Sequence, residues 1–170
     1  MKAIKLLILL PYLMLQIASA FAQNSATVIR VVDGDTYQLL KAGRTFTIRL
    51  ANVDAPESKQ QFGSEAASNV SGLILGKTVL IDSIGKDRYN RTIANITIKG
   101  MALDSIMVRN GWAWQYSTYN SSKALAELQK QAINEHLGVW GCGTNNVCPP
   151  WVFRNLNSKN RQRFCKNCNN

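Results

Sequence analysis

Four of the chain's ten acidic residues lie close together in the sequence, at the ends of two predicted strands. Asp33 and Asp35 follow a segment rich in β-branched residues, and Asp54 and Glu57 follow a segment with alternating apolar residues. If these strands are neighbours in a sheet, the four carboxylates converge at one end of it. Hard cations such as Ca²⁺ and Mg²⁺ prefer several oxygen ligands. The same short sequences are also ordinary turn chemistry, so on their own they leave the choice open.

Three arginines near these acids suit phosphate chemistry. Arg49 lies on the predicted strand before Asp54, and Arg88 and Arg91 flank Tyr89 in a later polar loop. Cleavage of a phosphodiester needs positive charge for the phosphate oxygens, a metal ion and a base that activates water. The planar fork of arginine matches phosphate better than a lysine ammonium does. Each arginine alone could be a surface ion pair, but the combination with the carboxylates favours a phosphodiesterase site.

The elements expected around these residues are short strands interleaved with helices. Strands are predicted at residues 27–32, 36–41, 44–53, 78–84 and 92–98. Helices are predicted at residues 63–75, 101–109 and 121–137. This pattern indicates an α+β fold, a five-stranded OB-fold barrel covered by about three helices, which is a known platform for nucleic acids.

The chain begins like a secretory signal peptide. Two lysines precede a short apolar run at residues 6–17, and small residues follow as far as Ala20 and Ala22. The run is too short for a comfortable membrane span. We therefore expect residues 1–22 to be removed after Ala20 or Ala22, and the mature chain to be secreted or periplasmic. It is expected to be a monomer that does not associate with a membrane.

The charge of the chain points to a polyanionic partner. Twenty Lys and Arg against ten Asp and Glu give a formal net charge of +10. Without Lys2 and Lys5 of the expected signal peptide, eighteen basic residues face ten acids, which leaves +8. Such a surface attracts nucleic acid, although a basic protein can also be merely soluble.

Three segments of the chain resemble, in family order, the signature segments of the staphylococcal nuclease (thermonuclease) family. They are Val32 to Thr36, Arg49 to Glu57, and Asp87 to Arg91. Shorter matches occur at residues 62–66 and 108–111, and the likeness runs from about Thr27 to Trp140. The resemblance implies a nuclease-like OB-fold domain at residues 25–141. Residues 142–170 are then a separate, cysteine-containing basic extension.

The resemblance implies Ca²⁺ as the cofactor and both DNA and RNA as substrates, cut to leave 3′-phosphate ends. It implies that Asp35, Asp54 and the backbone carbonyl of Ala55 bind the ion. An alternative from a different class is a non-catalytic nucleic-acid-binding OB-fold module, which has no need of such a set of residues.

The resemblance also implies roles for the other charged residues. Glu57 would position or deprotonate the attacking water. Arg49 and Arg91 would hold the phosphate and stabilise the transition state, with Arg91 nearest the departing 5′-oxygen.

Four residues are expected to contact the substrate, namely Arg88, Tyr89, Tyr116 and Tyr119. Position 88 carries Arg where lysine is more familiar in the family, which preserves the charge. Asn90 replaces a glycine of the tight turn, and Asn tolerates a positive φ. The segment that contains Tyr116 and Tyr119 does not align cleanly with the family, and Trp112, Trp114 and Tyr116 could equally fill the core or the groove wall.

The C-terminal extension contains all four cysteines of the chain, Cys142, Cys148, Cys165 and Cys168. In an exported protein four cysteines favour two disulfides, and the sequence does not choose their pairing. A Cys₄ zinc site is the alternative. Residues 151–170 carry five basic residues and no acid, which predicts either a salt-sensitive contribution to nucleic-acid binding or a solvated tail.

Overall fold

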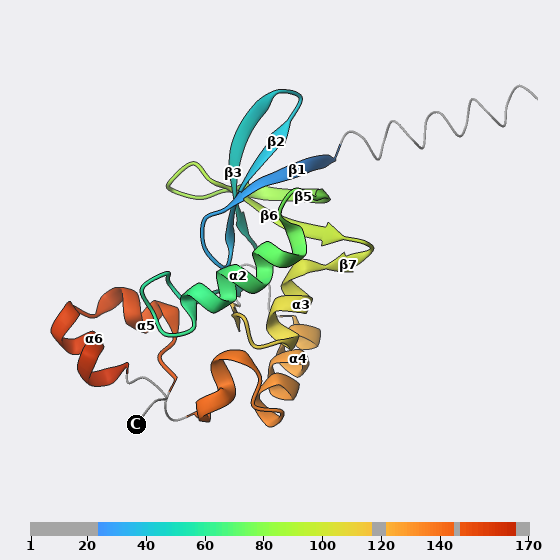
Figure 1. Ribbon diagram of the computed structural model, residues 1–170. Helices are drawn as coiled ribbons and strands as arrows, with labels where there is room; N and C mark the ends of the chain where they lie inside the picture. The colour runs from blue at the N-terminus through green and yellow to red at the C-terminus, as the bar shows by residue number, and fades with distance from the viewer. Residues whose placement is uncertain (1–23, 117–121, 145–146, 166–170) are drawn as a thin grey trace, which may run out of the picture.

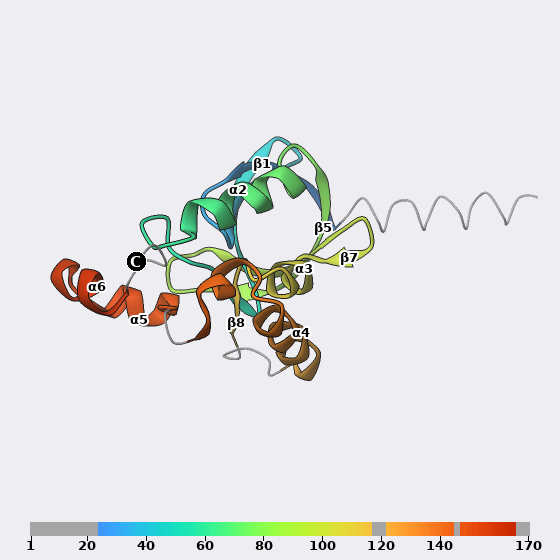
Figure 2. The ribbon, with the colours of Figure 1, turned by 60° about the horizontal axis from the view of Figure 1, so that its bottom comes forward.

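The computed structural model describes residues 24–116, 122–144 and 147–165. Its centre is a barrel of five strands, β1 (Ser25–Val31), β2 (Thr36–Lys41), β3 (Arg44–Leu50), β5 (Thr78–Lys86) and β6 (Thr92–Ile98). Neighbouring strands pair antiparallel in the order β3-β2-β1-β5-β6, and a parallel pairing of β3 with β6 closes the sheet (Figure 1). The strands form a ring in the view of Figure 2. The predicted α+β fold with a five-stranded barrel is therefore confirmed.

Three helices pack around this barrel, as the sequence predicts. α2 (Gly63–Ile74) lies against β1, and α3 (Leu103–Arg109) lies against β6. α4 (Lys123–Asn134) packs on α3, and the short 3₁₀ helix η1 (Gly138–Cys142) follows it (Figure 1). α2 and α3 therefore cover the barrel at β1 and β6, and α4 forms a second layer on α3.

The predicted strand at residues 44–53 is broken in the structure. β3 stops at Leu50, because Asn52 has a φ of 64° and turns the chain. The next residues form β4 (Val53–Asp54), which pairs with β8 (Trp114–Gln115) in a separate two-stranded sheet. Pairing with a distant segment thus decides where the strand ends, which alternation along the sequence does not reveal.

The predicted helices at residues 101–109 and 121–137 are shorter in the structure. α3 begins only after β7 (Met101–Ala102), which pairs with the end of β6. α4 begins after Ser122, whose side-chain oxygen accepts a hydrogen bond of 3.3 Å from the Leu125 N–H. This serine is the helix N-cap, since it satisfies one of the donors that the first turn leaves without a partner.

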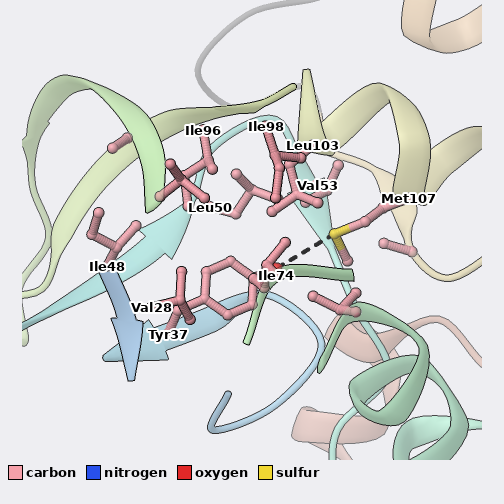
Figure 3. Close-up of a cluster of buried hydrophobic side chains, with 14 of the residues drawn as sticks. Val28, Tyr37, Ile48, Leu50, Val53, Ile74, Ile96, Ile98, Leu103 and Met107 are labelled. Carbon is pink, nitrogen blue, oxygen red and sulfur yellow. Dashed lines mark hydrogen bonds between the residues drawn. The ribbon is translucent and has the colours of Figure 1, made fainter. Parts of the chain in front are cut away.

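The hydrophobic core fills the barrel and the space beneath α2 and α3 (Figure 3). Its largest fully buried side chain, Tyr37, donates a hydrogen bond of 2.6 Å to the Gly34 carbonyl and lies 3.5 Å from the Met107 sulfur. Burial raises the pKa of Tyr37 well above its ordinary value, so the hydroxyl keeps its proton. The core is thereby tied to the turn that carries Asp33 and Asp35.

The C-terminal extension contains two short helices that the sequence pattern did not predict. They are α5 (Pro150–Asn155) and α6 (Ser158–Phe164). A disulfide between Cys148 and Cys165, whose Cα atoms are 5.0 Å apart, links the residues that flank this pair. The expectation of disulfide bonding is confirmed for these two cysteines. A zinc site built from all four cysteines is excluded, because two of the sulfurs are bonded to each other.

Some sequence predictions fall outside the residues that the structure describes. They concern the signal peptide at residues 1–22, Tyr119 and Cys168. These stay predictions. Within the described ranges, none of the helices has the length and apolar composition needed to cross a membrane.

We predict that Tyr37→Phe lowers the free energy of unfolding by about 1–3 kcal/mol. The Gly34 carbonyl loses its buried donor, while the packing of the ring hardly changes. Denaturant titration followed by tryptophan fluorescence measures the effect. The matched control is Tyr89→Phe, whose side chain is 65% exposed and which should change the unfolding free energy by less than about 0.5 kcal/mol. Equal destabilisation by the two variants would contradict the assigned role of the buried hydroxyl.

Candidate active site

One cavity of about 710 Å³ lies where β1, β3 and β5 end and gathers the residues with predicted chemistry. The predicted metal-binding and catalytic residues all line it, namely Asp35, Asp54, Ala55, Arg49, Glu57 and Arg91. Of the predicted substrate contacts, Arg88, Tyr89 and Tyr116 also line it. Residues as far apart in the sequence as Asp35 and Tyr116 therefore share one site, which permits them to act together.

The guanidinium of Arg49 joins the two buried aspartates. Its Nη1 lies 2.8 Å from Asp35 Oδ2, and its Nη2 lies 2.9 Å from Asp54 Oδ1. Nη1 also donates hydrogen bonds to the carbonyls of Leu50 and Val53, at 3.2 and 3.1 Å. The two carboxylate side chains are only 7% and 1% exposed. One planar group therefore compensates both negative charges and holds them on the same side of the cavity.

The turn that carries Asp35 packs directly against the turn after β4. A Cβ atom at Gly34 would lie 2.5 Å from the Ala55 Cβ, so only glycine permits this approach. The Ala55 N–H donates to Asp35 Oδ2 at 2.7 Å, and the Asp35 N–H donates to Asp33 Oδ1 at 3.1 Å. The direct bond between the turns fixes the position of the Asp35 carboxylate relative to the Ala55 backbone.

The environment of Asp35 shifts its protonation equilibrium. Burial raises the pKa of this carboxyl to about 7, the Arg49 guanidinium opposes the shift, and the negative charges of Asp33 and Asp54 add to it. The folded protein therefore holds a proton at Asp35 more tightly than the unfolded chain does. Such a group reduces stability as the pH rises from the unfolded-state pKa to the folded-state pKa.

The loop between β5 and β6 holds Arg91 through a carboxylate. Arg91 Nε lies 2.7 Å from Asp87 Oδ2, and Asp87 Oδ1 accepts hydrogen bonds from the N–H groups of Tyr89 and Arg91 at 2.9 and 3.0 Å. Asn90 has a φ of 63°, so it occupies the left-handed conformation expected of a residue in place of glycine. The guanidinium groups of Arg88 and Arg91 lie 4.9 and 5.5 Å from the centre of the Tyr89 ring. The loop therefore presents two cations and an aromatic ring at the cavity.

Glu57 lies on the loop between β4 and α2 and is held there by its backbone. A Cβ atom at Gly63, the first residue of α2, would collide with the Glu57 carbonyl, so the loop lies directly on the helix start. Gln60 Oε1 accepts a hydrogen bond of 3.1 Å from the Glu57 N–H, and Gln60 Nε2 donates to the Cys148 carbonyl. The loop is thus attached to the C-terminal extension as well as to α2.

The structure adds one residue to the site that sequence reasoning missed. Arg154 of α5 contacts Asp54 at 2.7 and 3.1 Å and Glu57 at 2.9 Å. In the sequence it is one of five basic residues of a segment beyond the family resemblance, about a hundred positions after its partners. Only its place beside a tryptophan and two prolines hinted at ordered structure there, so its position depends on how the extension folds.

The oxygen atoms at the buried end of the cavity suit a hard divalent cation. Asp35 and Asp54 bring carboxylates, and the Ala55 carbonyl belongs to the turn bonded to Asp35. Among the described residues, no three acidic, histidine or cysteine side chains form a ready-made metal cluster. Two carboxylates and a carbonyl would therefore hold the cation, while water or phosphate oxygens complete its coordination, as Ca²⁺ and Mg²⁺ both permit.

We predict that Asp35→Asn is more stable than wild type by a margin that grows as the pH rises from about 4 to about 7. Wild type must ionise a buried carboxyl over this range, whereas the variant carries no such group. The margin should be at most ~4 kcal/mol, the free energy that corresponds to the rise in the pKa of Asp35 from 3.8 to about 7. Denaturant titrations across the pH range, in buffer that contains a chelator, measure it.

The control for this experiment is Asp82→Asn, which removes an exposed carboxylate of β5. Its stability difference from wild type should not grow over the same pH range. A margin for Asp35→Asn that shrinks as the pH rises would mean that the ion pair with Arg49 outweighs burial.

Comparison with known proteins agrees with this geometry. Residues 47–142 match the family model of staphylococcal nuclease homologues. An Escherichia coli O157:H7 protein named as an uncharacterized endonuclease is 38% identical over 75% of this chain and 82% of its own length. A micrococcal nuclease of Shigella flexneri is 35% identical over 83% of this chain and 86% of its own length. A Haemophilus influenzae protein, also named as an uncharacterized endonuclease, is 34% identical over 78% and 74%. The chain belongs to the staphylococcal nuclease family.

Proposed function

We propose that the chain is an exported, Ca²⁺-dependent endonuclease that hydrolyses phosphodiester bonds of DNA and RNA and leaves 3′-phosphate ends. The observation that carries the proposal is the convergence of Arg49, Glu57 and Arg91 with the Asp35–Asp54 pair on one cavity. Family membership supports a nuclease, and the names of the Shigella and E. coli relatives, micrococcal nuclease and endonuclease, point the same way.

Asp35, Asp54 and the Ala55 carbonyl would hold the cation. When bound, Ca²⁺ supplies Lewis-acid polarisation of a phosphate oxygen. Arg49, which lines the same cavity, is paired with both carboxylates and so holds them at it. Because the side chains of Asp35 and Asp54 are almost fully buried, their charges act in an environment where water screens them little.

Arg49 and Arg91 would bind the oxygens of the scissile phosphate. Negative charge grows on these oxygens as water attacks phosphorus, and fixed guanidinium groups stabilise it without having to reorganise. Asp87 holds Arg91 through Nε at 2.7 Å, and Arg91 Nη1 lies 3.5 Å from Thr36 Oγ1 at the cavity, so the terminal nitrogens face the site. From that position, the guanidinium can donate two parallel hydrogen bonds to a phosphate.

Glu57 would position or deprotonate the attacking water, since its carboxylate is 37% exposed at the cavity. As the new bond from water to phosphorus forms, the bond from phosphorus to the 5′-oxygen breaks. The proton of the attacking water passes to Glu57 or to solvent. The leaving 5′-oxygen takes up a proton from solvent while Arg91, the group nearest to it, stabilises its negative charge, and the phosphate stays on the 3′-oxygen. The products are a 3′-phosphate end and a 5′-hydroxyl end.

The remaining features support a nucleic-acid substrate outside the cell. The formal charge of +8 that remains without Lys2 and Lys5 attracts the phosphate backbone, and the sequence begins like a signal peptide. Tyr89 is 65% exposed beside Arg88, so its ring is available to contact a base, and Tyr116 lines the same cavity. Tyr119 remains a predicted contact. The mature protein would act as a monomer that does not associate with a membrane.

We predict that the mature protein cuts single-stranded DNA and RNA in Ca²⁺ and not in EGTA. Arg91→Gln should lower kcat/KM by about 100-fold or more, because a donor to the transition-state charge is lost. Gel assays of end-labelled substrate measure cleavage, and sensitivity of the 3′ ends to a phosphatase identifies the product.

The matched control is Arg109→Gln, which removes the same charge from α3, where Arg109 lies 2.8 Å from Glu135 outside the cavity. Its kcat/KM should stay within about twofold of wild type, as expected for a surface substitution. If wild type binds DNA in Ca²⁺ but never cuts it, the enzymatic proposal is wrong and the non-catalytic OB-fold module takes its place. Equal losses in the two variants would show that net charge matters rather than the position of Arg91.

A further inference from the structure

Arg154 occupies the carboxylate end of the cavity. Its Nη2 lies 2.7 Å from Asp54 Oδ2, and its Nη1 lies 3.1 Å from Asp54 Oδ1 and 2.9 Å from Glu57 Oε1. Arg49 Nη2 is also 2.9 Å from Asp54 Oδ1, so guanidinium groups engage both oxygens of this carboxylate. The hydrogen bonds to Asp54 and Glu57 raise the pKa of Arg154, which keeps the guanidinium charged.

Contacts that do not involve Arg154 set the position of α5. Trp151 packs edge-on against Trp114 with ring centroids 6.3 Å apart, and Trp114 is the backbone pairing partner of Asp54. Arg161 of α6 donates a hydrogen bond of 2.9 Å to the Phe153 carbonyl and lies 4.3 Å from the centre of its ring. Phe153 itself is buried. α5 is therefore fixed to the segment that pairs with Asp54.

One disulfide and the hydrogen bonds of one glutamine side chain complete the attachment of the extension. The Cys148–Cys165 disulfide joins the two ends of the α5–α6 segment. Gln60 donates to the Cys148 carbonyl and accepts from the Glu57 N–H, so one side chain connects the extension with the Glu57 loop. Figures 1 and 2 both place α5 beside the loop that precedes α2. The α5–α6 segment is thus attached to the barrel domain by specific contacts, and these contacts place Arg154 at the site.

We infer that Arg154 is a further residue of the active site, which competes with the divalent cation for Asp54 and so sets how tightly the site binds that cation. The inference rests on the proposed function, in which Asp54 is a cation ligand. A cation at Asp54 Oδ2 is repelled by the guanidinium that lies 2.7 Å from the same oxygen, and it competes with Arg154 for the lone pairs there. Cation binding therefore weakens the contacts of Arg154, whichever of the two charges the carboxylate holds more tightly.

The side chain of Arg154 has room to move away from Asp54. It is 43% exposed, whereas Arg49, the other cation at Asp54, is 16% exposed and bonded to two backbone carbonyls. Of the two, Arg154 is the one that can leave. Because α5 stays attached through Trp151 and the disulfide, the displaced guanidinium would remain at the mouth of the cavity, where it adds to the positive charge of Arg91.

Calorimetric titration of Ca²⁺ into the mature, disulfide-bonded protein tests the inference without nucleic acid. Arg154→Gln should bind Ca²⁺ about tenfold more tightly than wild type at low ionic strength, because the charge-assisted hydrogen bonds that compete with the cation are gone. The gain should shrink at high salt, since exposed charges are screened. Arg154→Lys should fall between the two, because lysine keeps the charge and lacks the fork.

Lys159→Gln is the matched control, because it removes one exposed positive charge from α6 of the same extension. It should bind Ca²⁺ as wild type does. Equal tightening in this control, or unchanged or weaker binding in Arg154→Gln, would overturn the inference while leaving the proposed cation dependence intact. A purely structural role for Arg154 predicts weaker binding in its variants. If none of the proteins binds Ca²⁺, the proposed cation dependence is wrong and the inference falls with it.

Discussion

The candidate active site depends on one interaction, the placement of the Arg49 guanidinium between Asp35 and Asp54 at 2.8 and 2.9 Å. Two nearly buried carboxylates so close in space repel each other and lose hydration, and a paired cation must offset both costs. The same guanidinium also bonds the carbonyls of Leu50 and Val53, on either side of the turn between β3 and β4. The group that balances the charge therefore also shapes the corner of the chain that carries Asp54.

Close packing of small residues makes that arrangement possible. Gly34 and Ala55 bring two turns together, and the Tyr37 hydroxyl holds the first of them from inside the core. The negative charge of Asp35 is still unfavourable in this arrangement, because burial raises the pKa of its carboxyl to about 7. Carboxyls that are costly to ionise are typical of binding and catalytic sites, because a purely structural turn gains nothing from such a cost.

Local pattern predicted much of the barrel, since alternation reports which face of a strand is buried. β2 and β6 have the predicted bounds, whereas the break at Asn52 depends on pairing between β4 and β8, which no local pattern contains. For the site, the resemblance identified residues that the structure brings to one cavity, and their roles stay predictions. Arg154 escaped prediction because its position follows from a disulfide and aromatic packing in a segment outside the resemblance.

The extension and the cation site are coupled through Trp114. Its backbone pairs with Asp54, and its ring packs against Trp151 of α5 and, at 5.3 Å, against Trp140. A shift of α5 would therefore press on the strand that carries the proposed ligand, even apart from any contact by Arg154. Because Trp114 and Trp140 are buried and Trp151 contacts Trp114 edge-on, this attachment is non-polar and does not depend on the charge at the cavity. The extension is thus better regarded as a wall of the active site than as a tail appended to a finished domain.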